Sequence, residues 1–128
     1  MQLGQFAAVA ASVLLAALAV FQGALIAGAP WGRFAWGGQH NVLPTRLRIG
    51  SATSIVLYVL FAYVALAKAD LAPPLVNQGF TDVFCWVLTA YLALGIVLNG
   101  ISRSKPERLV MTPIVIVLTG LFLILALQ

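Results

Sequence analysis

His40 is the only histidine of this 128-residue chain, and imidazole is the side chain best suited to proton transfer or metal binding near neutral pH. A zinc site usually has three or four protein ligands, and a haem needs an axial ligand. The acidic residues, Asp70, Asp82 and Glu107, all lie far from the histidine in the sequence. Cys85 is the only cysteine, so no cysteine pair is available to bind a metal. We therefore predict no metal and no cofactor, and an enzyme that uses His40 stays as an alternative.

Basic and polar residues surround this histidine in a segment of about residues 29–48. Arginine presents a planar fork of N–H donors that matches two oxygens of a phosphate group. Such a set would suit an amphipathic anion, for example a phospholipid headgroup or an isoprenoid phosphate. The candidate ligand-binding residues of this segment are Arg33, Trp36, Gln39, His40, Arg46 and Arg48.

The composition decides which solvent surrounds these residues. Hydrophobic residues make up 62% of the chain and charged residues 8%, whereas soluble domains average about 45–50% and about 25%. So few charged groups cannot cover a surface that faces water. The composition therefore excludes a soluble domain, a disordered chain and a disulfide-stabilised scaffold, and an integral membrane protein remains.

Four apolar runs are long enough to cross a bilayer as helices, at about residues 6–28, 49–68, 83–99 and 109–127. None of them alternates as the strands of a membrane barrel do. The first run could also be a signal peptide, but no lysine or arginine precedes it. We predict an all-α integral membrane protein with a single membrane domain over residues 1–128, folded as an antiparallel bundle of four transmembrane helices.

Charged residues divide unevenly between the apolar runs. The segments after the first and third runs are net positive, and the segment after the second is net negative. Because short basic loops stay in the cytoplasm, we predict a multi-pass protein of the cell membrane, which is the inner membrane in a bacterium, with both termini outside. Charges divided between two membrane-proximal loops would follow a nucleic-acid backbone poorly. Membrane lipids, and not nucleic acid, are the predicted partners.

Uncharged polar residues inside the apolar runs gather in the predicted cytoplasmic half. They either hydrogen-bond between helices and to the preceding turn of their own helix, or they line a cavity that opens to the cytoplasm. The 29–48 segment is long for a four-helix protein, and its tryptophans would either anchor in the interface or form a folded lid over that cavity. The candidate residues of the cavity and its mouth are Gln22, Ser54, Tyr58, Tyr91, Asn99 and Arg103.

Small residues recur at helical spacing along the first apolar run. Such a face lets membrane helices approach closely. It would serve packing within one chain or, alternatively, the interface of a homo-oligomer. The residues of this small face are Ala8, Ser12, Ala16, Ala19, Gly23 and Ala27.

Local signals also mark where the later helices begin. Thr81 or Asp82 can cap the third helix through a side-chain oxygen. Ser104 and Glu107 match a capping box, in which the serine accepts from the backbone and the glutamate reaches back to the serine amide.

Three functional hypotheses follow. The leading one is a non-enzymatic membrane protein that binds a lipid-like anion or a membrane partner on its cytoplasmic side. The first alternative is an oligomeric transporter or channel for small solutes or ions, because four helices alone rarely enclose a pore. The second is the enzyme that uses His40.

Overall fold

The computed structural model describes all 128 residues as four long helices without a β-strand. The prediction of an all-helical chain is therefore confirmed. Two short 3-10 turns, η1 and η2, interrupt the connection between the first two helices. The elements are α1 (Leu3–Ile26), η1 (Gly32–Phe34), η2 (Trp36–Gly38), α2 (Thr45–Lys68), α3 (Gln78–Gly100) and α4 (Lys105–Ala126).

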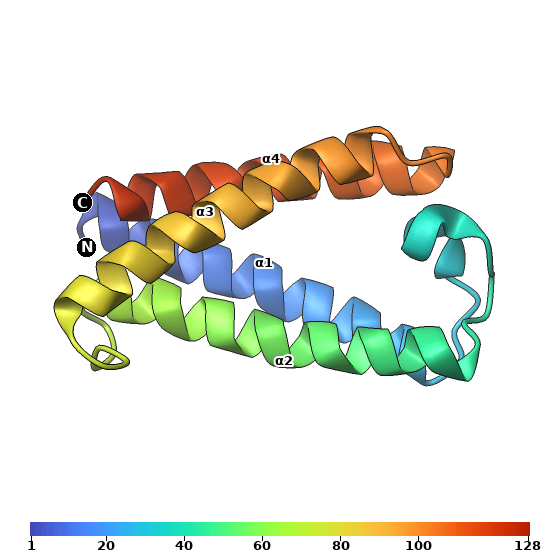
Figure 1. Ribbon diagram of the computed structural model, residues 1–128, viewed down its shortest axis with the longest axis horizontal. Helices are drawn as coiled ribbons and strands as arrows, with labels where there is room; N and C mark the ends of the chain where they lie inside the picture. The colour runs from blue at the N-terminus through green and yellow to red at the C-terminus, as the bar shows by residue number, and fades with distance from the viewer.

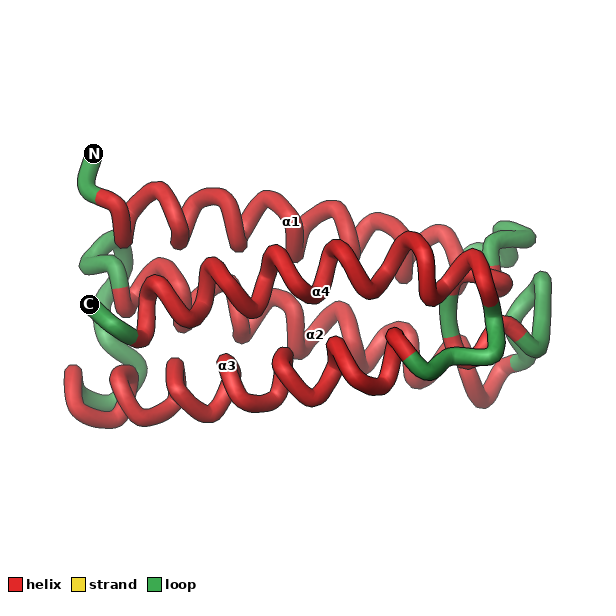
Figure 2. The backbone as a smooth tube through the Cα atoms, turned by 90° about the horizontal axis from the view of Figure 1, so that it is seen from above, coloured by secondary structure: helices red, strands yellow, loops and turns green.

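All four helices are long and apolar enough to cross a membrane. Each helix begins before its apolar run, because hydropathy marks only the part suited to lipid, whereas the helix continues through polar residues at its ends. Both termini and the α2–α3 connection lie at one end of the bundle, here called the terminal end (Figures 1 and 2). The other two connections lie at the opposite end, here called the loop end.

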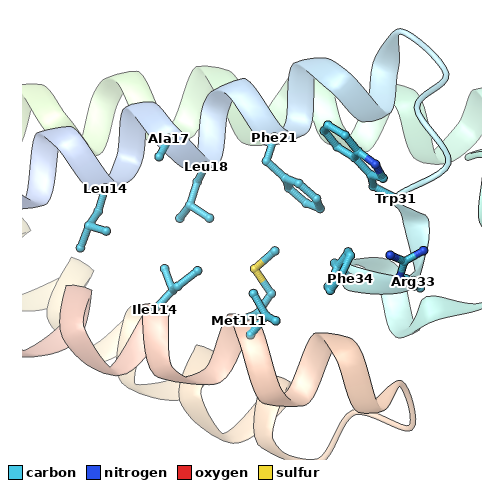
Figure 3. Close-up of a pocket in the computed structure, with 10 residues that line it drawn as sticks. Leu14, Ala17, Leu18, Phe21, Trp31, Arg33, Phe34, Met111 and Ile114 are labelled. Atoms are coloured by element: carbon cyan, nitrogen blue, oxygen red, sulfur yellow. The ribbon is translucent and has the colours of Figure 1, made fainter.

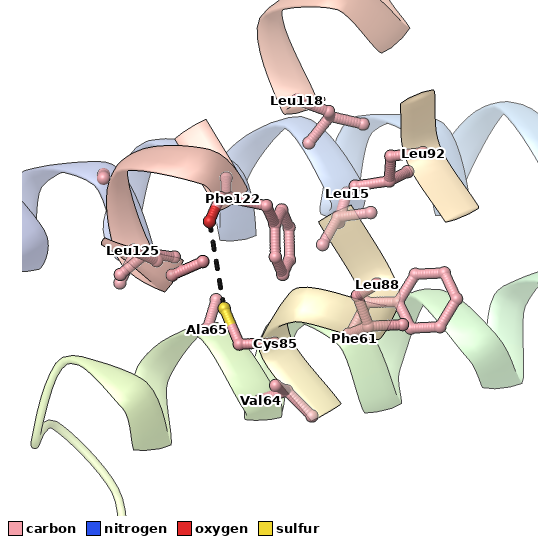
Figure 4. Close-up of a cluster of buried hydrophobic side chains, with 14 residues drawn as sticks. Leu15, Phe61, Val64, Ala65, Cys85, Leu88, Leu92, Leu118, Phe122 and Leu125 are labelled. Atoms are coloured by element: carbon pink, nitrogen blue, oxygen red, sulfur yellow. Dashed lines mark hydrogen bonds between the residues drawn. The ribbon is translucent and has the colours of Figure 1, made fainter. Parts of the chain in front are cut away.

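The hydrophobic core occupies the half of the bundle nearest the terminal end. Fourteen buried residues form it, including Leu15, Phe61, Cys85 and Phe122 (Figure 4). Close van der Waals packing of these side chains stabilises this half. Small side chains such as Ala8 allow it, and the α1–α2 and α3–α4 pairs make the most extensive contacts.

The small face of α1 is divided by the fold. Ala8 is completely buried in the core, whereas Ala16 and Ala27 are exposed. Ala16 and Ala19 line a shallow groove against α2. Packing within the chain thus uses part of the face, and a homo-oligomer through the rest stays a prediction.

The helix starts follow the sequence signals only in part. Asn77 caps α3, since its side chain accepts from the Phe80 amide at 2.8 Å. The prediction of a cap at Thr81 or Asp82 is wrong, because the helix begins about one turn earlier. There the Thr81 hydroxyl donates to the Asn77 carbonyl and Asp82 pairs with Lys68 at 2.9 Å. Ser104 does cap α4, accepting from the Glu107 amide at 3.4 Å.

Removal of a large core side chain tests this packing. We expect Phe122→Ala to destabilise the protein by about 3 kcal/mol, because the lost contacts leave a cavity that rigid neighbours cannot fill. Leu123→Ala, at a side chain that is 40% exposed on the same helix, should change stability by only about 0.5 kcal/mol. Thermal unfolding in detergent, followed by circular dichroism, measures both. Equal losses from the two variants would contradict the placement of the core.

Candidate functional site

The α1–α2 connection, residues 27–44 and here called loop 1, folds into a compact lobe at the loop end. The Gly32 amide donates to the Asn41 carbonyl at 2.8 Å and closes the lobe at its base. A Cβ at Gly32 would lie 1.8 Å from the His40 carbonyl oxygen, so only glycine fits there. The lobe lies between the α1–α2 and α3–α4 pairs, which diverge toward this end (Figure 1).

Trp36 attaches the lobe to α2. Its indole Nε1 donates to Ser51 Oγ at 3.2 Å, and its ring lies so close to Gly50 that an added Cβ would sit 2.8 Å from it. The tryptophan has a φ of 53°, a left-handed conformation that costs free energy for a bulky residue. The contacts with α2 hold this conformation in place.

Glu107 and Ser104 attach the same lobe to α4. The Gly37 amide donates to Glu107 Oε2 at 3.0 Å, and the Ser104 hydroxyl donates to the Arg33 carbonyl. The predicted return bond from Glu107 to the Ser104 amide is therefore wrong. Ser102 Oγ already accepts from that amide at 3.1 Å, which leaves the carboxylate for the loop.

A half-open cavity of about 200 Å³ lies beneath the lobe, lined by side chains from all four helices and from the lobe itself. We call it the polar chamber. Its lining residues are Leu18, Phe21, Gln22, Phe34, Ala35, Trp36, Ser54, Tyr58, Asn99, Glu107, Met111 and Val115.

The polar chamber contains a carboxylate without a cationic partner and an amide oxygen without a hydrogen-bond donor. Glu107 is 8% exposed, and no basic group lies within 4.0 Å of its carboxylate, since Lys68–Asp82 is the only ion pair. Gln22 is also 8% exposed, and its Oε1 has no hydrogen-bond partner. Buried polar groups without partners are costly in apolar surroundings.

Ser54 of α2 and Asn99 of α3 both donate within their own helices. Ser54 Oγ donates to the Gly50 carbonyl at 3.1 Å, and Asn99 Nδ2 donates to the Gly95 carbonyl at 2.8 Å. Bonding to the preceding turn and lining of a cavity, which the sequence left as alternatives, thus occur together. The oxygens of both groups, the second N–H of Asn99 and the Tyr58 hydroxyl remain available to the chamber, and no basic side chain lines it.

Five of the predicted candidate residues line this chamber, namely Gln22, Trp36, Ser54, Tyr58 and Asn99. Tyr91 lines an adjoining apolar cavity together with Tyr58 and Asn99. The other candidates fall elsewhere: Arg33 lines a separate groove, and Gln39, His40, Arg46, Arg48 and Arg103 line no cavity.

Sequence reasoning assigned Glu107 only to helix capping and so missed its place in the chamber. The loop satisfies the Gly38 amide itself, through the Ala35 carbonyl at 2.8 Å, whereas the Gly37 amide takes its acceptor from α4. The one signal in the sequence is that Glu107 is the only carboxylate at the loop end.

Arg33 lies in an apolar groove of about 380 Å³ between α1 and α4 (Figure 3). Its guanidinium carbon sits 4.8 Å from the centre of the Phe34 ring. Nine of the ten lining residues are hydrophobic, and Arg33 is the charged one. We call this the α1–α4 groove, and it is lined by Leu14, Ala17, Leu18, Phe21, Trp31, Arg33, Phe34, Val110, Met111 and Ile114.

The chemistry at His40 is limited by its neighbours. No carboxylate lies within 4.0 Å of its imidazole. No group of three or more histidine, cysteine, aspartate or glutamate residues lies close enough to hold a metal ion.

No protein-family model, curated protein or solved structure matches this chain. The groove and the chamber are therefore the features of the molecule that bear on its function.

The Gly37–Glu107 contact generates a direct prediction. Glu107→Ala leaves a partly buried amide without an acceptor, which costs about 1–3 kcal/mol, so the lobe should detach more often. Hydrogen–deuterium exchange over residues 32–41 should then be faster than in the wild type. Glu107→Gln retains an acceptor and should exchange at nearly the wild-type rate. Identical exchange in the alanine and glutamine variants would contradict this role.

Proposed function

We propose that this chain is a non-enzymatic, multi-pass membrane protein that binds a lipid-like anionic amphiphile in the α1–α4 groove. The main support for this proposal is the position of Arg33, which is the only cation in the groove and lies at its loop end. An acyl chain would lie along α1 and α4, and the anionic headgroup would meet the guanidinium.

The donors of Arg33 support this proposal. No guanidinium N–H of Arg33 makes a hydrogen bond within the protein, whereas Arg48 and Arg108 donate to the Leu43 and Ser102 carbonyls at 2.8 and 2.9 Å. A planar guanidinium with free donors can bind two phosphate oxygens at once. Trp31 and Phe34 beside it provide the amphipathic surface that favours the headgroup level of a bilayer.

The distribution of charge supports an antiparallel arrangement in the bilayer with the loop end in the cytoplasm. Asp70 and Asp82 belong to the other end, and short basic loops remain on the cytoplasmic side. The groove would then open toward the anionic lipids of the inner leaflet. Six of the seven lysines and arginines belong to the loop end, namely Arg33, Arg46, Arg48, Arg103, Lys105 and Arg108.

The anion is assigned to the groove and not to the polar chamber. Glu107 is the only charged residue that lines the chamber, so a headgroup there would meet a like charge. The transporter, the channel and the enzyme at His40 stay predictions from the sequence, since no feature of the cavities specifically favours them.

Replacement of Arg33 tests the headgroup contact. Native mass spectrometry of the purified protein should show preferential retention of an anionic phospholipid, phosphatidylglycerol, over phosphatidylcholine. Arg33→Gln should weaken that retention roughly tenfold, as expected for loss of a charge-assisted hydrogen bond. Arg46→Gln, at an exposed arginine that lines no cavity, is the matched control. Retention that is equal for both lipids in the wild type would refute the proposal.

A bulky residue in the groove tests the acyl-chain site. Ala17 is exposed and lines the groove, so Ala17→Trp should fill the groove without disturbing the core. The variant should lose bound lipid in the same native mass spectra. Ala10→Trp adds the same side chain to α1 at an exposed position outside every cavity, and it should keep its lipid. Retained lipid in Ala17→Trp would place the lipid elsewhere.

A further inference from the structure

The polar chamber contains an uncompensated negative charge. Glu107 is more than nine-tenths buried, its carboxylate accepts one bond from the Gly37 amide, and no cation of the protein balances it. A buried carboxylate without a nearby cation is costly in apolar surroundings. The polar chamber therefore offers space and a negatively charged group for a cation from outside the chain.

A second, independent group points to the same occupant. Gln22 comes from α1, whereas Glu107 comes from α4, and the buried Oε1 of Gln22 accepts no hydrogen bond within the chain. An amide oxygen and a carboxylate are both acceptors. Together they favour a bound group that donates hydrogen bonds or carries a positive charge. The oxygens of Ser54 and Asn99 add further acceptor capacity, because the Ser54 hydroxyl and one N–H of Asn99 already donate within their helices.

The remaining walls favour an organic cation over a metal ion. Four aromatic side chains line the chamber, Phe21, Phe34, Trp36 and Tyr58. Aromatic faces attract ammonium groups, and quaternary ammonium ligands are bound in this way. The volume of about 200 Å³ equals the liquid volume of roughly seven water molecules, so a bare ion would leave most of it unfilled.

We propose that the polar chamber binds a small organic ammonium ion, with Glu107 and Gln22 as its polar partners and the aromatic walls around its alkyl groups. The lobe of loop 1 covers the bound ion, because Phe34, Ala35 and Trp36 form the wall of the chamber on that side. This site is distinct from the α1–α4 groove. Leu18, Phe21, Phe34 and Met111 line both spaces and separate the ammonium ion from Arg33.

Calorimetric titration of the full-length protein in detergent tests the proposal, with tetramethylammonium chloride as the probe and sodium phosphate as the buffer. The wild type should show saturable binding with one ion per chain. Glu107→Gln keeps the acceptor for the loop amide but loses the charge, and it should bind at least about tenfold more weakly. Gln22→Leu removes the second acceptor at similar size and should also weaken binding.

The matched control is Asp70→Asn, which removes an exposed carboxylate at the terminal end. Asp70 has a φ of 61°, a conformation that asparagine tolerates, so this variant should bind as the wild type does. Absence of saturable binding in the wild type, or equal affinity in Glu107→Gln, would overturn the proposal. The lipid measurements test the α1–α4 groove with a different ligand. A failure of lipid binding there would not decide the outcome of this titration.

Discussion

The hydrogen bond between the Gly37 amide and the Glu107 carboxylate ties loop 1 to the helix bundle. Irregular backbone needs acceptors for its buried amide groups, and this loop obtains one from a residue seventy positions later in the chain. The same bond helps to fix where Trp36 and Phe34 lie, since Trp36 precedes Gly37 in η2 and Phe34 ends the adjoining turn η1. The polar chamber and the end of the α1–α4 groove therefore both depend on it.

The bundle divides into two halves with different packing. Near the terminal end, small residues such as Ala8 and Ala65 allow the helices to approach, and Phe122 fills the space that remains. Toward the loop end, larger side chains and the inserted lobe keep the helix pairs apart, and the polar chamber and much of the groove are found there. The hydrophobic core and the proposed binding sites thus lie in opposite halves of the same four helices.

The two spaces at the loop end have opposite electrostatic character although they share four apolar lining residues. Arg33 faces the groove, and Glu107 faces the chamber. The two charges do not form an ion pair with one another. Each is therefore available to a ligand, an anion in the proposed function and a cation in the chamber.

The sequence by itself determined the helical class and the number of helices, because long uncharged runs can satisfy their backbone in lipid only as helices. It also identified Gln22, Ser54 and Asn99 as a polar group at one end, since depth within a helix follows from position along the chain. Only the tertiary structure decided that Arg33 and Glu107 lie in separate spaces and that Glu107 binds loop 1. Those facts depend on how the loop docks against α2 and α4, and contacts between residues so distant in the chain are set by packing and not by local spacing.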